Sequence, residues 1–252
     1  MPSIRTVNIE AGAGTTVTND PTGDERTLFP IQAALGYDLT QTMFIGEQSL
    51  IVEGVSDFWY LSSVSEYLVE QNRDGLPAGV VLTPAGGAQK VSYMVALLTA
   101  QRLRVLVLLD NEPTADNAMK EMLRSSLLRT DAVLRVADAF GASAPQEADI
   151  EDLLDPGVFD QLVQNTYTAE LAGRTLTINS HIPRIVKRYE EAFNSLGIDF
   201  HKTRPAKLFL RRVAEAPASV LPNPSLERFE NLFKLVHQRF DAQERRGQQP
   251  FR

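Results

Sequence analysis

The chain has 252 residues and a net charge of −7, and 43% of its residues are hydrophobic. A chain of this length can bury a sizeable core and form one large domain or two smaller ones. It has no cysteine, which excludes disulfides, thiolate zinc sites and iron–sulfur clusters. Its three histidines, His181, His201 and His237, are well separated in the sequence. A metal site would therefore use oxygen ligands, which favours magnesium or manganese.

Residues 1–48 hold short apolar pieces and several turn-forming residues. We predict a lead-in segment here, with one helix over 29–44. The glycine-rich stretch 11–16 is not a phosphate loop, because no Gly-Lys-Ser/Thr follows at the required spacing. The N-terminus lacks a secretory signal, and no run of about 18 apolar residues could span a membrane. We therefore expect a cytoplasmic protein without membrane contact.

From residue 49 onward, apolar runs alternate with segments of helical spacing. The apolar runs predict four strands, over 49–53, 79–83, 104–109 and 132–136. The segments between them predict three helices, over 57–71, 88–101 and 114–128. Continuously apolar strands joined by helices are typical of a parallel sheet with helices on both faces. The pattern predicts an α/β domain over 49–157.

Residues 158–252 lose the strand pattern, and we predict a helical domain there. Its candidate helices cover 182–196, 205–215 and 225–244. In the last of these, apolar residues recur at helical spacing from Leu226 to Phe240, which indicates a stripe that packs in a core.

Acidic residues follow the predicted strands. Glu53 ends the first strand and Asp57 lies one helical turn later, while Asp110 ends the third strand and Glu112 follows it. Two more acids, Asp149 and Glu151, come after the fourth strand. Ligands bind beyond the carboxyl ends of parallel strands, and gathered carboxylates are retained when a cation neutralises them. The alternative for each acid, and for Asp57 in particular, is a helix cap or first-turn residue.

Four sequence blocks in order resemble a Toprim domain. They are Leu-Ile-Val-Glu-Gly at 50–54 with Asp57, Pro-Ala-Gly-Gly-Ala-Gln-Lys at 84–90, Leu-Leu-Asp-Asn-Glu at 108–112 and Ile-Glu-Asp-Leu-Leu at 150–154. Within Toprim proteins the chain is most similar to OLD (overcoming lysogenisation defect) nucleases, whose additions to the core resemble 28–37 and the last block. The resemblance covers about residues 25–160.

The resemblance implies a Toprim-like parallel sheet with a C-terminal helical domain. It also implies a metal-dependent DNA endonuclease that works with two Mg²⁺ or Mn²⁺ ions. The implied metal ligands are Glu53, Asp57, Asp110, Glu112, Asp149 and Glu151. Glu112 departs from the family pattern, which has aspartate there. Glu53 and Asp110 would be catalytic, together with a lysine of the helical region, for which Lys202 fits best and Lys207 second.

OLD proteins place an ATPase domain before the nuclease region. This chain has no Walker A lysine motif, so it resembles the nuclease region alone, without a nucleotide of its own. For the full-length protein, the resemblance implies an ATPase domain in the same chain, a helicase-like partner, a homo-oligomer and a role in phage defence.

The segment from Arg184 to Arg212 has eight basic and three acidic residues. A basic surface beside an acidic metal site is typical of proteins that bind polyanions, and DNA is the expected partner. The candidate contacts are Lys187, Arg188, Arg204, Lys207, Arg211 and Arg212. The alternative is a solvated helical face.

Two other functions compete with the nuclease. A degenerate Toprim module could bind DNA or metal and regulate or assemble a complex without cleaving. Topoisomerase chemistry would need a nucleophilic tyrosine. Four tyrosines lie in helical patterns that indicate packing, namely Tyr60, Tyr67, Tyr93 and Tyr189, and neither Tyr37 nor Tyr167 has a supporting motif.

Overall fold

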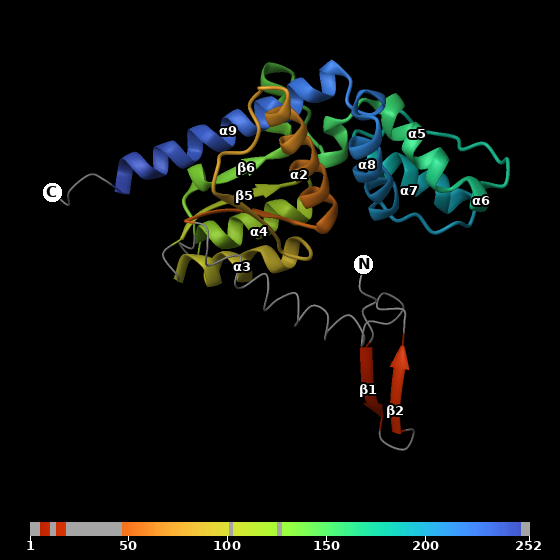
Figure 1. The fold of residues 1–252 in the computed structure, drawn as a ribbon, viewed down its shortest axis with the longest axis horizontal. Coiled ribbons are helices and arrows are strands. Elements are labelled where there is room, and N and C mark those ends of the chain that lie inside the picture. The colour runs from red at the N-terminus through yellow and green to blue at the C-terminus, as the bar shows by residue number, and fades with distance from the viewer. Residues whose placement is uncertain (1–5, 11–13, 19–46, 101–102, 125–127, 248–252) are drawn as a thin grey trace. The chain divides into compact units, whose positions relative to one another are not determined.

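The computed structural model describes residues 6–10, 14–18, 47–100, 103–124 and 128–247. The chain forms two compact units, Met1–Gly46 and Glu47–Arg252. In the first, β1 (Thr6–Glu10) and β2 (Gly14–Thr18) pair as an antiparallel hairpin (Figure 1). The sequence patterns did not predict this hairpin, although its Thr, Val and Ile residues favour extended backbone. The helix predicted over 29–44 lies outside the described residues.

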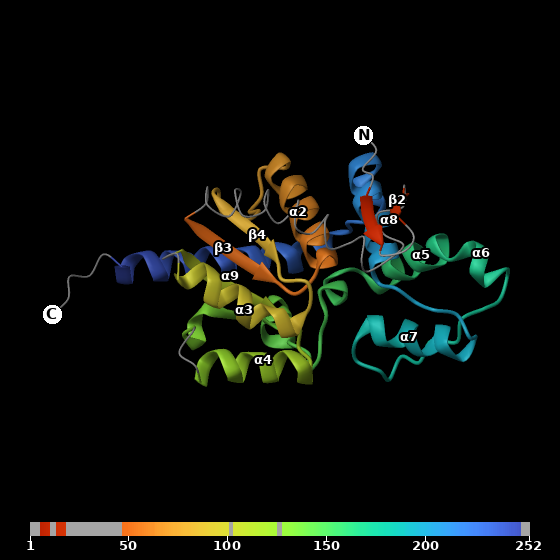
Figure 2. The same ribbon diagram turned by 90° about the horizontal axis from the view of Figure 1, so that it is seen from below.

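The second unit contains the predicted α/β fold. Its sheet has four parallel strands in the order β4-β3-β5-β6. The strands are β3 (Gln48–Val52), β4 (Val80–Pro84), β5 (Arg104–Leu109) and β6 (Val133–Arg135). Helices cover both faces, with α2 and α9 on one side and α3 and α4 on the other (Figures 1 and 2). This double cover explains why the residues from Val105 to Leu109 are all apolar and buried.

Three helices connect the strands, as predicted. They are α2 (Val55–Glu70), α3 (Ala88–Ala100) and α4 (Pro113–Arg124). Strand β6 is shorter than predicted, because Asp138 Oδ2 accepts the Arg135 backbone N–H at 2.9 Å and the chain turns into the 3₁₀ helix η2 (Val136–Ser143). Tyr93 is 73% exposed, so its predicted packing is wrong; α3 instead directs Val91 and Val95 into the core.

The chain after β6 is helical, as predicted. The elements are η3 (Ile150–Leu153), α5 (Pro156–Thr166), α6 (Thr168–Leu171), α7 (Ile185–Ser195), α8 (Thr203–Glu215), η4 (Pro217–Ser219) and α9 (Asn223–Gly247). Helix α5 begins where Asp155 Oδ1 accepts the N–H groups of Gly157 and Val158. In the described part of the chain, no helix has both the length and the apolarity that crossing a membrane requires.

Helix α9 returns to the sheet. Its apolar stripe is buried, as predicted, and Gln243 on α9 donates to the Val105 backbone oxygen of β5 at 3.0 Å. Helix α8 packs against α2 and α5. Residues 47–252 therefore form one unit, and the boundaries at 48/49 and 157/158 stay predictions.

We expect Phe233→Ala to lower the free energy of unfolding by about 3–5 kcal/mol, because truncation of a buried aromatic ring leaves a cavity. Phe233 is 0% exposed. Chemical denaturation followed by circular dichroism measures the change. Tyr93→Ala is the control at an exposed position and should stay within about 0.5 kcal/mol of the parent. A Phe233→Ala effect as small as the control's would mean that α9 is not part of the core.

Candidate metal centre

Glu53 and Asp110 meet at the carboxyl edge of the sheet. They follow β3 and β5, which are neighbouring parallel strands. The Asp110 backbone N–H donates to Glu53 Oε1 at 2.9 Å. The adjacent amide of Asn111 donates to the Ala148 carbonyl at 2.7 Å, which brings Asp149 and the residues after it to the same edge.

Backbone turns hold Glu53 in place. Gly86 and Gly87 have positive φ values of 81° and 123°, which glycine adopts readily. The Gly87 N–H donates to the Glu53 carbonyl at 2.7 Å. The Gly-Gly pair thus forms a tight turn that is tied to the backbone of Glu53.

Asp57 caps a helix and also has an unpartnered oxygen. Its Oδ2 accepts the Gly54 N–H at 2.8 Å, at the start of α2. Its Oδ1 is buried without a hydrogen-bond partner. The cap that the sequence gave as an alternative is therefore present, and it leaves one oxygen available to a cation.

Arg184 lies between two of the predicted ligands. Its Nε donates to Asp149 Oδ1 and its Nη1 donates to Glu112 Oε2, both at 2.7 Å. The Arg184 side chain is only 10% exposed. Arg184 belongs to the basic segment 184–212, and no local pattern in the sequence links it to acids so distant in the chain.

Lys202 is the lysine that reaches the acids. Its Nζ lies 3.5 Å from Glu151 Oε2 and 3.9 Å from Asp110 Oδ2. The Lys207 side chain is exposed on α8. The geometry therefore favours Lys202 over Lys207 as the lysine of the site.

Tyr167 positions the backbone next to Lys202. Its hydroxyl accepts the His201 N–H at 2.7 Å and lies 3.2 Å from the His201 carbonyl, to which it donates. The ring is buried against Phe193 and Phe200. The sequence gave Tyr167 no role, because this contact joins residues far apart in the chain.

Three buried carboxylate oxygens have no hydrogen-bond partner: Asp57 Oδ1, Asp149 Oδ2 and Glu151 Oε1. The Tyr60 hydroxyl is also buried without one. Within the described ranges, no three His, Cys, Asp or Glu side chains form a set that could hold a metal ion as they stand. Lys202 and Arg184 contact four of the six predicted ligands. Buried, unpartnered carboxylate oxygens are nevertheless hard ligands of the type that Mg²⁺ and Mn²⁺ prefer.

Burial shifts the titration of these acids to higher pH. It raises the pKa of Glu53 to about 6 and the pKa of Glu151 to about 7. It also raises the pKa values of three aspartates, Asp57, Asp110 and Asp149. Burial lowers the pKa of Lys202, but the carboxylates around it outweigh this effect and hold that pKa well above its ordinary value. The lysine therefore stays protonated.

The predicted DNA contacts lie on α7 and α8. Exposed side chains are those of Lys187, Arg204, Lys207 and Arg211, and half-buried ones are those of Arg188 and Arg212. Some of these side chains already form ion pairs within the protein. Arg204 forms a 2.7 Å ion pair with Glu170 and lies over the Tyr167 ring, and Lys187 pairs with Glu190 at 2.6 Å.

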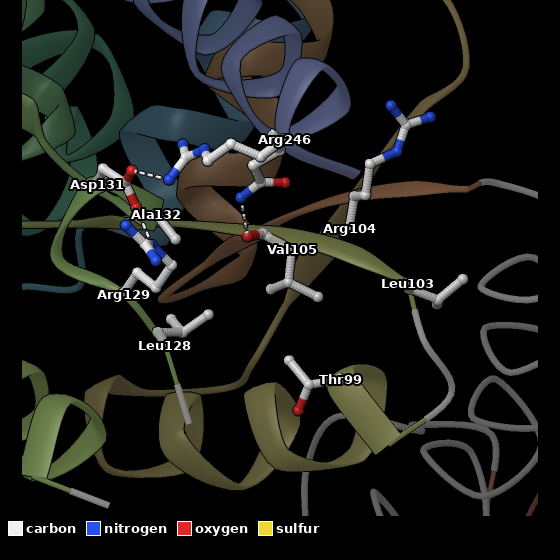
Figure 3. Close-up of a pocket in the computed structure, with 10 residues that line it drawn as sticks. Thr99, Leu103, Arg104, Val105, Leu128, Arg129, Asp131, Ala132 and Arg246 are labelled. Atoms are coloured by element: carbon white, nitrogen blue, oxygen red, sulfur yellow. Dashed lines mark hydrogen bonds and ion pairs between the residues drawn. The ribbon is translucent and has the colours of Figure 1, made fainter. Parts of the chain in front are cut away.

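A separate cavity of about 430 Å³ lies at the opposite end of β5, beside Arg104 and Val105 (Figure 3). Its three arginines have acidic partners. Arg104 pairs with Glu47 and Glu244, while Arg129 and Arg246 both contact Asp131. Because Asp110 follows the other end of the strand, this cavity is not part of the metal centre.

The centre combines buried anionic oxygens with a protonated lysine at one edge of the sheet. Carboxylate oxygens are the ligands that divalent cations prefer, and a protonated lysine can direct a fixed positive charge at a phosphate. No protein-family model, curated protein or solved structure matches the chain. What the centre does is therefore inferred from its own side chains and from the sequence blocks that resemble Toprim.

We expect Glu151→Gln to raise the melting temperature at pH 8 without divalent ions, and the gain to shrink by pH 5. Above its folded-state pKa of about 7, the buried Glu151 carboxylate is charged and destabilises the fold. As the pH falls through that value, the folded protein takes up a proton before the unfolded chain does, so the parent gains stability. Differential scanning calorimetry measures the melting temperatures of the parent and the variant at both pH values. Glu66→Gln, at an exposed position of α2, is the control; a pH-independent gain would contradict the argument.

Proposed function

We propose that this chain is a metal-dependent DNA endonuclease of the Toprim type, the nuclease region of an OLD-family protein. The observation that carries the proposal is the set of three buried carboxylate oxygens without protein partners, from Asp57, Asp149 and Glu151. Asp57 and Glu151 belong to blocks that resemble Toprim, Asp149 directly precedes the last block, and the protonated Lys202 lies 3.5 Å from Glu151. An acidic cluster that served stability alone would not leave such oxygens unpartnered, because each costs free energy.

The acids and the lysine would divide the work of phosphodiester hydrolysis. Glu53, Asp57, Asp110 and Glu151 would hold Mg²⁺ or Mn²⁺, with Asp149 beside them. Such ions supply a water of lowered pKa and positive charge for the leaving oxygen. Lys202 would hold a proton near the reacting phosphate, where negative charge grows towards the transition state. Tyr167 would keep Lys202 in reach through the His201 backbone.

DNA would approach across α7 and α8. The exposed Lys207 and Arg211 lie on the same helix that Lys202 begins. Contacts of this kind to the phosphate backbone add affinity without reading sequence. We therefore propose cleavage without strong sequence preference and, in this chain, without ATP.

The second candidate is a Toprim-like module that binds DNA or metal without cleaving. The Glu112–Arg184 ion pair favours it, because an arginine holds an oxygen of one predicted ligand. The two candidates differ in one measurable property, which is strand cleavage in the presence of divalent ions.

We expect the chain to nick supercoiled plasmid with Mg²⁺ or Mn²⁺ and to stop in excess chelator. Glu53→Gln and Asp110→Asn should lower nicking to background, because each removes an anionic ligand while keeping a hydrogen-bonding group. Gel electrophoresis measures nicking, and circular dichroism checks folding. Nicking that persists in chelator would refute metal catalysis. Metal binding and DNA binding without any nicking would support the second candidate.

We expect Lys202→Ala to slow single-turnover cleavage on the order of a hundredfold, since it removes a charge that acts on the transition state. Lys207→Ala is the matched control on the same helix. It should weaken DNA binding and flatten its salt dependence by roughly one unit of slope, with the rate at saturating enzyme little changed. The opposite pattern would assign the catalytic role to Lys207.

A further inference from the structure

Arg184 joins two carboxylates that would otherwise repel each other. Glu112 follows β5 and Asp149 precedes η3, and each gives Arg184 one oxygen at 2.7 Å. The Arg184 side chain is 10% exposed and that of Asp149 is 1% exposed. A guanidinium stays charged at every pH at which proteins are folded. Arg184 is therefore a permanent cation inside the acidic centre.

We propose that Arg184 takes the place of one divalent ion, so that the centre binds a single Mg²⁺ or Mn²⁺ rather than two. This inference rests on the proposed function and concerns the same site. It divides the six predicted ligands into two sets. Arg184 pairs with Glu112 and Asp149, and the metal ion is held by the remaining acids: Glu53, Asp57, Asp110 and Glu151.

The cost of releasing Arg184 supports this division. For Glu112 to bind a metal through Oε2, it would have to give up its ion pair with Arg184. A second ion at this position would also lie next to the guanidinium, and like charges at such distances repel strongly in a buried site. A buried arginine without its partner is strongly unfavourable. The ion pair is therefore expected to persist when metal binds.

The unpartnered oxygens support the same division. Asp57 Oδ1 and Glu151 Oε1 are buried and without partners, and these residues are 4% and 0% exposed. Neither contacts Arg184. Asp149 remains paired through Oδ1 and keeps only Oδ2 for a metal ion. Two of the three unpartnered oxygens thus belong to acids outside the Arg184 pairs, and one of these acids, Glu151, contacts Lys202.

The test counts the Mn²⁺ ions that the whole chain binds without DNA. Mn²⁺ is added stepwise, electron paramagnetic resonance measures the free ion, and the difference from the total gives the bound ions. We expect one site in the parent and one in Glu112→Gln. Arg184→Gln should bind two, because Glu112 and Asp149 are freed for a second ion. Arg184→Gln combined with Glu112→Gln should return to one. Arg73→Gln, which frees Glu230 from a 2.8 Å ion pair outside the centre, is the control and should stay at one.

Thermal unfolding gives a second measurement. Arg184→Gln should melt below the parent without metal and recover with Mn²⁺, since the second ion replaces the lost charge. If Arg184→Gln does not fold, the number of Mn²⁺ ions bound by Glu112→Gln tests the inference, because this variant leaves Arg184 paired with Asp149. Two sites in the parent, or a loss of the site in Glu112→Gln, would overturn the inference and leave the nuclease proposal standing. No site in the parent would overturn both.

Discussion

The adjacency of β3 and β5 in a parallel sheet is the constraint on which the rest of the centre depends. It places the ends of the two strands side by side, so that Glu53 accepts the backbone N–H of Asp110. Burial removes hydration from both carboxylates and neighbouring acids repel them, so the pKa values of both rise. The other acids of the centre add to this negative charge, which backbone N–H groups and two cations balance.

The balance comes from two kinds of partner. Glu53 and Asp57 accept backbone N–H groups, which the ends of β3 and β5 and the start of α2 provide. The other four acids contact a cation: Asp110 and Glu151 contact Lys202, and Glu112 and Asp149 contact Arg184. Both cations come from the helical segment after α6, more than thirty residues beyond Glu151 in the chain. The sheet and this helical segment therefore build the centre together.

Two residues that precede this helical segment, Tyr167 and Asp152, fix where the cations lie. Tyr167 binds the backbone of His201 through its hydroxyl, and Asp152 accepts the Ile185 N–H at 3.0 Å, directly after Arg184. Each of these contacts anchors the backbone beside a cation rather than the cation itself. Long side chains placed in this way lose less freedom when they meet a partner, because the backbone is already positioned.

The sequence by itself determined the sheet and the acids. Continuous apolar runs such as 104–109 can be buried only between two layers of helices, so they predicted the strands, and residues that end strands in a parallel sheet must share one edge. It did not reveal the hairpin of 6–18, since Thr and Val among glycines give a weak strand signal. Only the tertiary structure decided which side chains contact the acids and position the cations of the centre. Arg184 with Glu112 and Tyr167 with His201 join residues 72 and 34 positions apart, and no local period connects positions that meet only when helices pack against the sheet.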